Sequence, residues 1–158
     1  MDFSELMTGF CSMLDIEGAE PDTDGAYHFE IDEMPVSFME LESLRQIVVW
    51  GDVGEMPPGS REQLYKALME AMFMGEGTGG SSFSIDRESG RVVLQHLAPL
   101  AVLDEDSFKA MVERFVNVLE EWRKLIADFR DVAPELERAA ETAEEENRNF
   151  GLGGFIQV

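Results

Sequence analysis

The segment from Gly75 to Leu100, together with the apolar run that follows it, constrains the fold of this chain most. Glycines crowd residues 75–80 and interrupt the chain ahead of a short strand, and DRESG at residues 86–90 has the composition of a tight turn into a second strand. From Leu103 to Phe129, apolar residues then recur at helical spacing. A hairpin that leads into a long amphipathic helix predicts a sheet packed against helices.

The first third of the chain predicts a helix followed by strands. Residues 2–14 place apolar side chains at the spacing of one helix face, and residues 27–31 alternate apolar and polar side chains as a half-buried strand does. Two more strands are expected at about residues 35–41 and 43–52.

The third of these strands is apolar on both faces. Leu44, Val48 and Trp50 are expected to point one way, while Ile47 and Val49 point the other. A strand of this kind needs cover on both sides of its sheet.

A second helix is expected after the prolines at residues 57 and 58. Ser60 and Gln63 have the spacing of a capping box at its start, and its apolar stripe runs from Leu64 to Met72. The predicted order is therefore α-β-β-β-α-β-β-α. This is an α+β fold in which a twisted, mainly antiparallel sheet packs against helices.

Two regions are expected along the chain, a domain at residues 1–130 and a flexible acidic tail at 131–158 with an apolar end. Pro134 is expected to end the long helix, because proline lacks the N–H that the helix needs. The tail carries seven acidic and two basic residues, a net charge of 2 − 7 = −5. The whole chain carries −21, so most of the negative charge belongs to the domain.

Composition excludes several classes of function. A net charge of −21 repels nucleic acid and anionic lipid, and no apolar run approaches the roughly 20 residues of a membrane span. The single cysteine, Cys11, excludes an intramolecular disulfide and a four-thiolate zinc site. No basic, apolar leader pattern begins the chain. We expect a cytoplasmic protein with no membrane insertion.

Catalytic, metal and cofactor motifs are all incomplete. Glu20, Asp22 and Asp24 fit the first positions of a calcium loop, but Ile31 stands where its bidentate glutamate belongs. The glycines at residues 75–80 lack the lysine of a phosphate loop and lead from helix to strand. His28 and His96 have no recognisable nucleophile beside them. We therefore expect no catalytic residues, no metal, no cofactor and no enzyme activity.

Apolar residues are more numerous than one covered sheet face requires. The chain has ten Met, eleven Phe and two Trp, and a single sheet layer backed by three helices buries only one face. Either a second copy or a partner chain would cover the other. The acidity leaves an alternative open, an acidic DNA mimic or other interaction module that titrates a basic partner.

The chain resembles a known family through three short motifs in this element order. They are GTGG at residues 77–80, GRVVL at 90–94, and Trp122 in the long helix. Together they resemble the class I type III secretion chaperones of the CesT/Tir chaperone family, over about residues 3–129. The resemblance implies a homodimer that binds the N-terminal region of a secreted effector in extended form. It would act without ATP and keep the effector soluble and export-competent, and the export apparatus would be a further candidate partner.

The resemblance also implies two sets of site residues. The long acidic tail departs from the shorter family pattern, and its role does not follow from the resemblance. The residues expected to bind the effector are Phe3, Met7, Phe10, Val36, Phe38, Val48 and Trp50. Those expected in the dimer interface are Leu64, Leu68, Met72, Phe83 and Val93.

Overall fold

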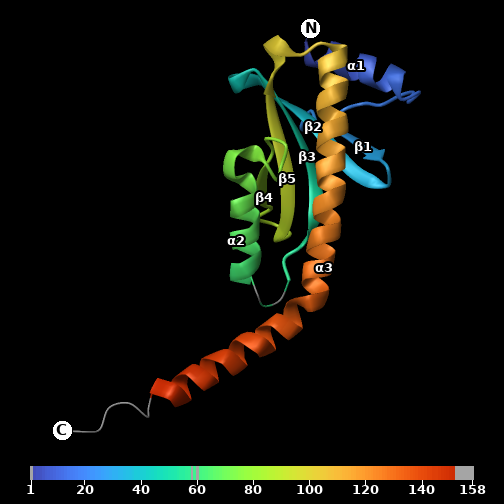
Figure 1. The fold of residues 1–158 in the computed structure, drawn as a ribbon. Helices are drawn as coiled ribbons and strands as arrows, with labels where there is room; N and C mark the ends of the chain where they lie inside the picture. The colour runs from blue at the N-terminus through green and yellow to red at the C-terminus, as the bar shows by residue number, and fades with distance from the viewer. Residues whose placement is uncertain (1, 58, 60, 152–158) are drawn as a thin grey trace, which may run out of the picture.

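The structure, a computed structural model, describes residues 2–57, 59 and 61–151, and it has the predicted order of helices and strands (Figure 1). Ser60, half of the expected capping box, lies outside the described residues. The helices are α1 (Phe3–Met13), α2 (Arg61–Met72) and α3 (Glu105–Gly151), and three short 3-10 turns are η1 (Glu42–Leu44), η2 (Phe73–Gly75) and η3 (Leu100–Val102). The strands are β1 (Tyr27–Ile31), β2 (Met34–Leu41), β3 (Gln46–Glu55), β4 (Ser82–Ile85) and β5 (Arg91–Pro99).

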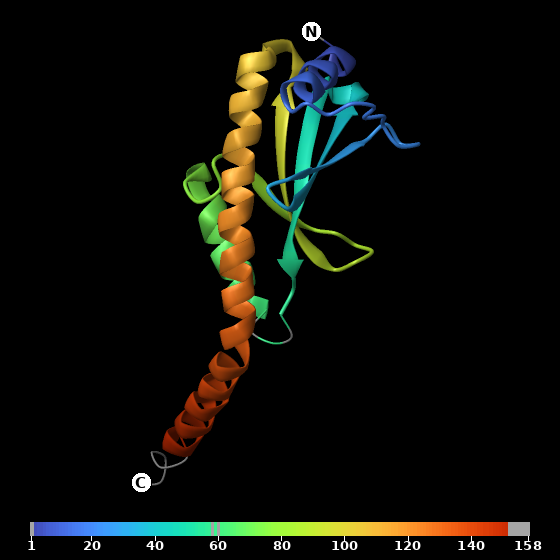
Figure 2. The ribbon, with the colours of Figure 1, turned by 90° about the vertical axis from the view of Figure 1, so that its right-hand side faces the viewer.

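The five strands form one antiparallel sheet in the order β1-β2-β3-β5-β4. The helices lie on one side of this sheet, and the β4–β5 hairpin curls away from them toward the other side (Figure 2). The predicted α+β class is confirmed. Within the part of the chain that the structure describes, no helix covers the second face.

The core lies between the sheet and the helices, and aromatic rings fill its centre. The ring of Phe10 in α1 lies 5.6 Å from Phe29 in β1, 5.5 Å from Phe38 in β2 and 5.4 Å from Phe108 in α3, measured between centroids. Rings at these separations gain edge-to-face attraction in addition to the burial of their surface. The apolar stripe of α1 therefore joins two strands to the long helix.

Helix α3 approaches the sheet so closely that β3 needs a glycine. A Cβ on Gly51 would lie 2.4 Å from the Cδ2 atom of Leu119, which is shorter than any real contact. The same helix holds the glycine-rich loop, because the Trp122 Nε1 atom donates a 2.8 Å hydrogen bond to the carbonyl of Gly77. The GTGG motif thus serves a structural contact between the loop and α3.

Two predictions about element boundaries are wrong. The third strand begins at Gln46 rather than near Ser43, because η1 and a left-handed Arg45 (φ 52°) precede it, and Leu44 in η1 is 60% exposed instead of facing the sheet. Helix α3 does not end before Pro134 but continues to Gly151. It bends where the ribbon turns from orange to red (Figure 1). A proline removes one backbone hydrogen bond and kinks a helix without always ending it.

The remaining boundaries agree with the sequence. The expected turn at Ser89 and Gly90 joins β4 to β5, and Phe83 pairs with Leu94 and Ile85 with Val92, as the alternation predicts. None of the helices among the described residues combines the length and apolar character of a membrane span. The division of the chain at residue 130 stays a prediction.

Candidate functional site

The uncovered face of the sheet carries its side chains in cross-strand rows. One row is apolar, with Met39 paired to Val48 and Val48 paired to Leu97 across β2, β3 and β5. Directly opposed side chains in antiparallel strands lie about 4.5–5.5 Å apart and pack against each other. Because this row has no helix over it, Leu97 remains 40% exposed.

The next row has a tryptophan at its centre and polar side chains around it. The pairing runs from His28 through Ser37, Trp50 and Gln95 to Ser82, and so includes all five strands. His28 is held in place, because its Nδ1 atom lies 2.8 Å from Ser37 Oγ. Its ring meets the Trp50 ring edge-on at 6.3 Å. Trp50 thus lies between the apolar row and a row that can form hydrogen bonds.

An ion-pair network forms the third part of this face. The Arg91 Nε atom donates to Asp52 Oδ1 at 2.8 Å, its Nη2 to Asp52 Oδ2 at 2.6 Å, and its Nη1 to Glu55 Oε1 at 3.0 Å. A bidentate contact between arginine and a carboxylate fixes the orientation of the guanidinium group. The hydrogen bonds with Asp52 raise the pKa of Arg91 above its ordinary value. The arginine charge is therefore already neutralised within the site.

The turn of the β4–β5 hairpin supplies one wall. The Asp86 carboxylate accepts hydrogen bonds from the Ser89 hydroxyl and from the backbone N–H groups of Glu88 and Ser89. These bonds, that of the Ser89 hydroxyl first, hold the pKa of Asp86 below its ordinary value. Asp86 therefore remains ionised at neutral pH and adds negative charge to the wall.

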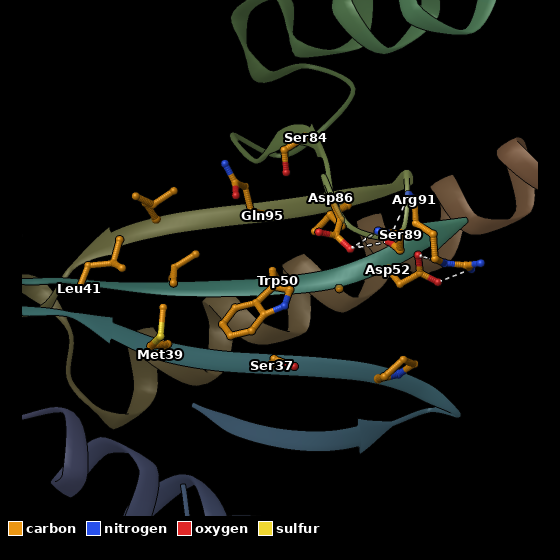
Figure 3. A pocket seen from close by; sticks show the side chains of 15 residues that line it. Ser37, Met39, Leu41, Trp50, Asp52, Ser84, Asp86, Ser89, Arg91 and Gln95 are labelled. Carbon is orange, nitrogen blue, oxygen red and sulfur yellow. Dashed lines mark hydrogen bonds and ion pairs between the residues drawn. The ribbon is translucent and has the colours of Figure 1, made fainter. Parts of the chain in front are cut away.

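Together these parts enclose a groove of about 770 Å³ on the uncovered face (Figure 3). Figure 3 shows Leu41 and Met39 at one end, Trp50 in the middle, and Asp52 with Arg91 at the other end. We call this surface the open-face groove. Its lining residues are Pro35, Ser37, Met39, Leu41, Val48, Trp50, Gly51, Asp52, Ser84, Asp86, Ser89, Arg91, Val93, Gln95 and Leu97.

Only two of the residues expected to bind an effector lie at this groove, Val48 and Trp50. The alternation of β2 turns Val36 and Phe38 toward the helices, where each is fully buried. The apolar stripe of α1 packs into the same core. The remaining expected residues, Phe3, Met7 and Phe10, are thus buried within this chain, and their contact with an effector stays a prediction.

The residues expected in the dimer interface do not form one surface. Leu64 and Leu68 of α2 are buried in the core. Met72 is half-buried and its sulfur accepts from the Phe83 N–H at 3.2 Å, while Phe83 packs edge-on against Trp122 at 4.8 Å. Val93 lines the open-face groove on the opposite side of the sheet.

A different set of α2 residues is exposed. Tyr65 and Met69 in α2 and Phe73 at the start of η2 follow one another at four-residue intervals, and Met74 comes next with a left-handed φ of 56°. Phe73 is 72% exposed and Met74 is 80% exposed. We call these four residues the α2 stripe. In the sequence, Tyr65 and Met69 stand one position after the buried Leu64 and Leu68, and this second apolar spacing would have indicated the exposed stripe.

The structure places a hydroxyl beside His28, whose Nδ1 lies 2.8 Å from Ser37 Oγ and whose Nε2 lies 2.9 Å from Asp22 Oδ2, so the expectation that His28 has no nucleophile beside it is wrong. Among the described residues, no three His, Cys, Asp or Glu side chains are arranged to hold a metal ion. Asp22, from the calcium-loop pattern, instead accepts hydrogen bonds from the N–H groups of Asp24 and Ala26 and from His28. The described part of the chain is therefore an α+β domain whose sheet has one face covered by helices and one face with an apolar row open to solvent.

The comparison with known proteins names the family. Residues 5–123 match the Tir chaperone protein (CesT) family, and the chain belongs to this family. The resemblance drawn from the sequence is thereby confirmed, and the family is one of chaperones. The chain is also 29% identical over 120 residues to the Chlamydia pneumoniae protein CPj0713/CpB0740, a match that covers 75% of this chain and 91% of that protein.

Solved structures confirm the fold at low sequence identity. A chain of the ExsC–ExsE complex is similar with a TM-score of 0.67 and 20% identity, over 79% of this chain and 96% of that one. A chain of the HopA1–SchA chaperone–effector complex has a TM-score of 0.64 and 15% identity, with coverages of 77% and 93%. A chain of the complex between the Yersinia pestis type III secretion chaperone SycH and a YscM2 fragment has a TM-score of 0.59 and 18% identity, over 77% of this chain and 99% of that one.

Proposed function

We propose that this protein is a cytoplasmic type III secretion chaperone that binds the N-terminal region of a secreted effector in the open-face groove. The effector segment would lie there as an extended chain, held soluble and ready for export without ATP. The observation that carries the proposal is the groove itself. It is lined by the apolar side chains of Met39, Val48, Trp50 and Leu97, of which Leu97 is 40% exposed.

Two further observations support this proposal. A single sheet layer with helices on one side leaves a face that a partner can cover. The similar structures include one described as a chaperone–effector complex and one described as a type III secretion chaperone with a bound fragment. Contact with the export apparatus stays a prediction.

The proposal is tested by comparing how well the wild type and two variants capture the partner. Trp50→Glu places a charge in the groove, and Leu44→Glu makes a similar change at an exposed site in η1 as a control. Tagged protein from the native bacterium would be isolated, its partners identified by mass spectrometry, and the protected region mapped by limited proteolysis. We expect the wild type and Leu44→Glu to hold a secreted protein through its N-terminal region, and Trp50→Glu to lose it.

The effect of salt on partner binding distinguishes this function from that of an acidic mimic of DNA. An apolar groove holds its partner at 0.5 M NaCl, whereas phosphate mimicry depends on screened Coulomb attraction and fails there. Capture of basic DNA-binding proteins that dissociate in high salt would contradict the chaperone function. Retention of the secreted protein by a folded Trp50→Glu variant would contradict the groove as its site.

We infer further that the protein is a homodimer and that the α2 stripe forms its interface. Tyr65, Met69, Phe73 and Met74 expose apolar surface on the helix side of the sheet, away from the open-face groove. A two-fold interface uses the same patch on both subunits. Pairing of two α2 stripes would bury these side chains and leave both grooves free for effector.

A further inference from the structure

The open-face groove offers a ligand mainly apolar and neutral polar side chains. Among the described residues that line it, three are charged, Asp52, Asp86 and Arg91. Asp52 and Arg91 neutralise each other, because two hydrogen bonds at 2.8 and 2.6 Å join the guanidinium group to both carboxylate oxygens. Burying a charge without a partner is costly. The groove therefore favours an uncharged apolar segment over a charged one.

The chain itself contains a segment of this kind directly after α3. Residues 152–158 have the sequence LGGFIQV, with four apolar side chains larger than glycine and no charged residue. The 21 residues before them, 131–151, carry seven acids and two bases, a net charge of 2 − 7 = −5. In an extended chain, Leu152, Ile156 and Val158 would share one face, because side chains alternate. The segment is thus suited to an apolar surface, and the helix before it is suited to water.

The length of this segment matches the length of the groove. Alternate residues of β5 line the groove from Arg91 to Leu97. At about 3.3 Å per residue, these positions span roughly 20 Å. Residues 152–158 are equally numerous and span about the same length when extended. One copy of the segment is therefore sufficient to fill the groove from end to end.

The course of α3 leads this segment away from the groove of its own chain. Beyond Phe129 the helix leaves the body and runs away from the side toward which the β4–β5 hairpin curls (Figure 2). From Phe129 to Gly151 it continues for 151 − 129 = 22 residues, or about 33 Å at 1.5 Å per residue. A segment that spans roughly 20 Å does not lead back over this distance to the opposite face of the sheet. The groove within its reach belongs to another molecule.

We propose that residues 152–158 of a second copy of this chain occupy the open-face groove until another ligand displaces them. Their apolar side chains pack over Trp50 and Leu97, which removes exposed apolar surface from water. A weak contact is sufficient, because in the homodimer inferred above the effective concentration of the segment is on the order of millimolar. The proposal rests on the proposed chaperone function in one respect only, that an effector is the ligand that displaces the segment.

Photo-cross-linking with isotope labelling shows where the segment binds and in which copy. Full-length protein with p-benzoylphenylalanine in place of Ile156 and heavy nitrogen throughout would be mixed with unlabelled wild type, left to exchange subunits, and irradiated. We expect mass spectrometry to find the heavy segment joined to light peptides that contain Met39 or Leu97. The same photoreactive residue at Leu125, which is 53% exposed on α3, is the control and should not reach the groove. Trp50→Glu in the light copy should lower the yield at least about threefold.

A binding assay measures how much of the groove the segment occupies. A fluorescein-labelled peptide FGLGGFIQV would be titrated with the full-length wild type and with the full-length double variant Ile156→Gln, Val158→Gln. Occupied sites raise the apparent dissociation constant in inverse proportion to the free fraction. We therefore expect the double variant to bind the peptide at least about threefold more tightly, and Leu125→Gln to match the wild type. Addition of Trp50→Glu to the double variant should abolish binding, whereas 0.5 M NaCl should change the affinity for this uncharged peptide less than about twofold.

Three results would overturn the proposal. One is the absence of cross-links from position 156 to the groove, and another is cross-links confined to a single copy. The third is equal peptide affinity for the wild type and the double variant, including no binding by either. If any of these is found while Trp50→Glu still loses the secreted partner, the groove is the partner site and only its occupation by the segment is wrong. If a folded Trp50→Glu variant keeps the partner although the cross-links reach the groove, the proposed function fails and this contact stands.

Discussion

Phe38 and Met39 are neighbours in β2 with opposite surroundings. Phe38 points toward the helices, where its ring lies 5.5 Å from Phe10 and 5.8 Å from Phe108, and none of its surface is exposed. Met39 points the other way and lines the open-face groove. One residue supports the fold and the next is available to a ligand, so substitutions at the two positions separate stability from binding.

Alanine at each position gives the first prediction. We expect Phe38→Ala to lower the free energy of unfolding by about 3–5 kcal/mol, because it leaves a cavity where three rings meet. Met39→Ala should cost roughly 1 kcal/mol or less, since its side chain already faces water. Urea unfolding followed by circular dichroism would measure both. Equal losses would show that the groove face is packed as tightly as the core.

His96 gives a prediction about pH. It is half-buried in β5, its Nδ1 atom lies 3.3 Å from Ser81 Oγ, and burial, followed by the charge of Arg114, lowers its pKa below the ordinary value of 6.5. The folded state therefore disfavours the protonated ring, and stability present above pH 6.5 is lost as the pH falls toward the folded pKa. We expect unfolding free energy to fall more between pH 7.5 and pH 5 in the wild type than in His96→Gln. Parallel pH profiles would contradict this.

At the scale of elements, α3 has two parts with different roles. Phe108, Leu119 and Ile126 bury their side chains against the sheet, and Phe129 packs against the edge of the core. Beyond this point the ribbon leaves the body of the protein (Figures 1 and 2). The stability of the domain should therefore depend on the first part alone.

Truncation tests that division of α3. A chain that ends at Ala133 retains Phe129 and one further helical turn, so we expect its melting temperature to lie within about 3 °C of the full-length value, because it loses less than about 1 kcal/mol of packing. A second chain that ends at Lys124 loses Ile126 and Phe129 and should melt at least about 8 °C lower. A large loss in the longer chain would show that the helix beyond Pro134 stabilises the domain.

The elements were predictable from sequence where one physical pattern dominated. Alternation gave β1 and the β4–β5 pairing, and helical spacing gave α1 and the start of α3. The start of β3 was not predictable, because η1 depends on the left-handed Arg45 and on the hydrogen bond from the Leu100 N–H to the Arg45 carbonyl, a contact between distant parts of the chain. From sequence, Pro134 predicts a helix end, because the sequence does not distinguish a kink from the end of a helix.

The candidate site was predicted only in part, for a related reason. Val48 and Trp50 follow from the family resemblance, and they lie on a strand that is apolar on both faces, which implies cover beyond the helices. The stripe of α1 and the residues Val36 and Phe38 were equally apolar, but the chain uses them in its own core. Which of two apolar faces is covered depends on tertiary packing. The charged end of the groove was not predictable, because the residues that meet there, Asp52 and Arg91, are 39 positions apart.

For the whole molecule, strong negative charge coexists with two exposed apolar surfaces, the open-face groove and the α2 stripe. A charge of −21 makes copies of the chain repel one another at long range. Only an interface that buries enough apolar area overcomes that repulsion, and salt lowers it. Uncontrolled association through the groove is thereby disfavoured, while a matched two-fold contact remains accessible.

The last prediction concerns the α2 stripe, where replacing apolar residues with glutamate is expected to yield a monomer. We expect the wild type to sediment as a dimer at micromolar concentration, and Met69→Glu with Phe73→Glu to sediment as a folded monomer. In a two-fold contact each substitution acts twice, placing four carboxylates in a face that was apolar. Leu44→Glu, at an equally exposed leucine in η1, should remain dimeric.

The same variants show whether dimer and groove are independent. Because Met69 and Phe73 lie on the helix side of the sheet and Trp50 on the other, the monomeric variant should still capture the secreted partner to within about threefold of the wild-type amount. Trp50→Glu, conversely, should remain a dimer in analytical ultracentrifugation. A dimer that survives both α2 substitutions but dissociates on Trp50→Glu would place the second copy on the open sheet face, and the groove would then be the subunit interface.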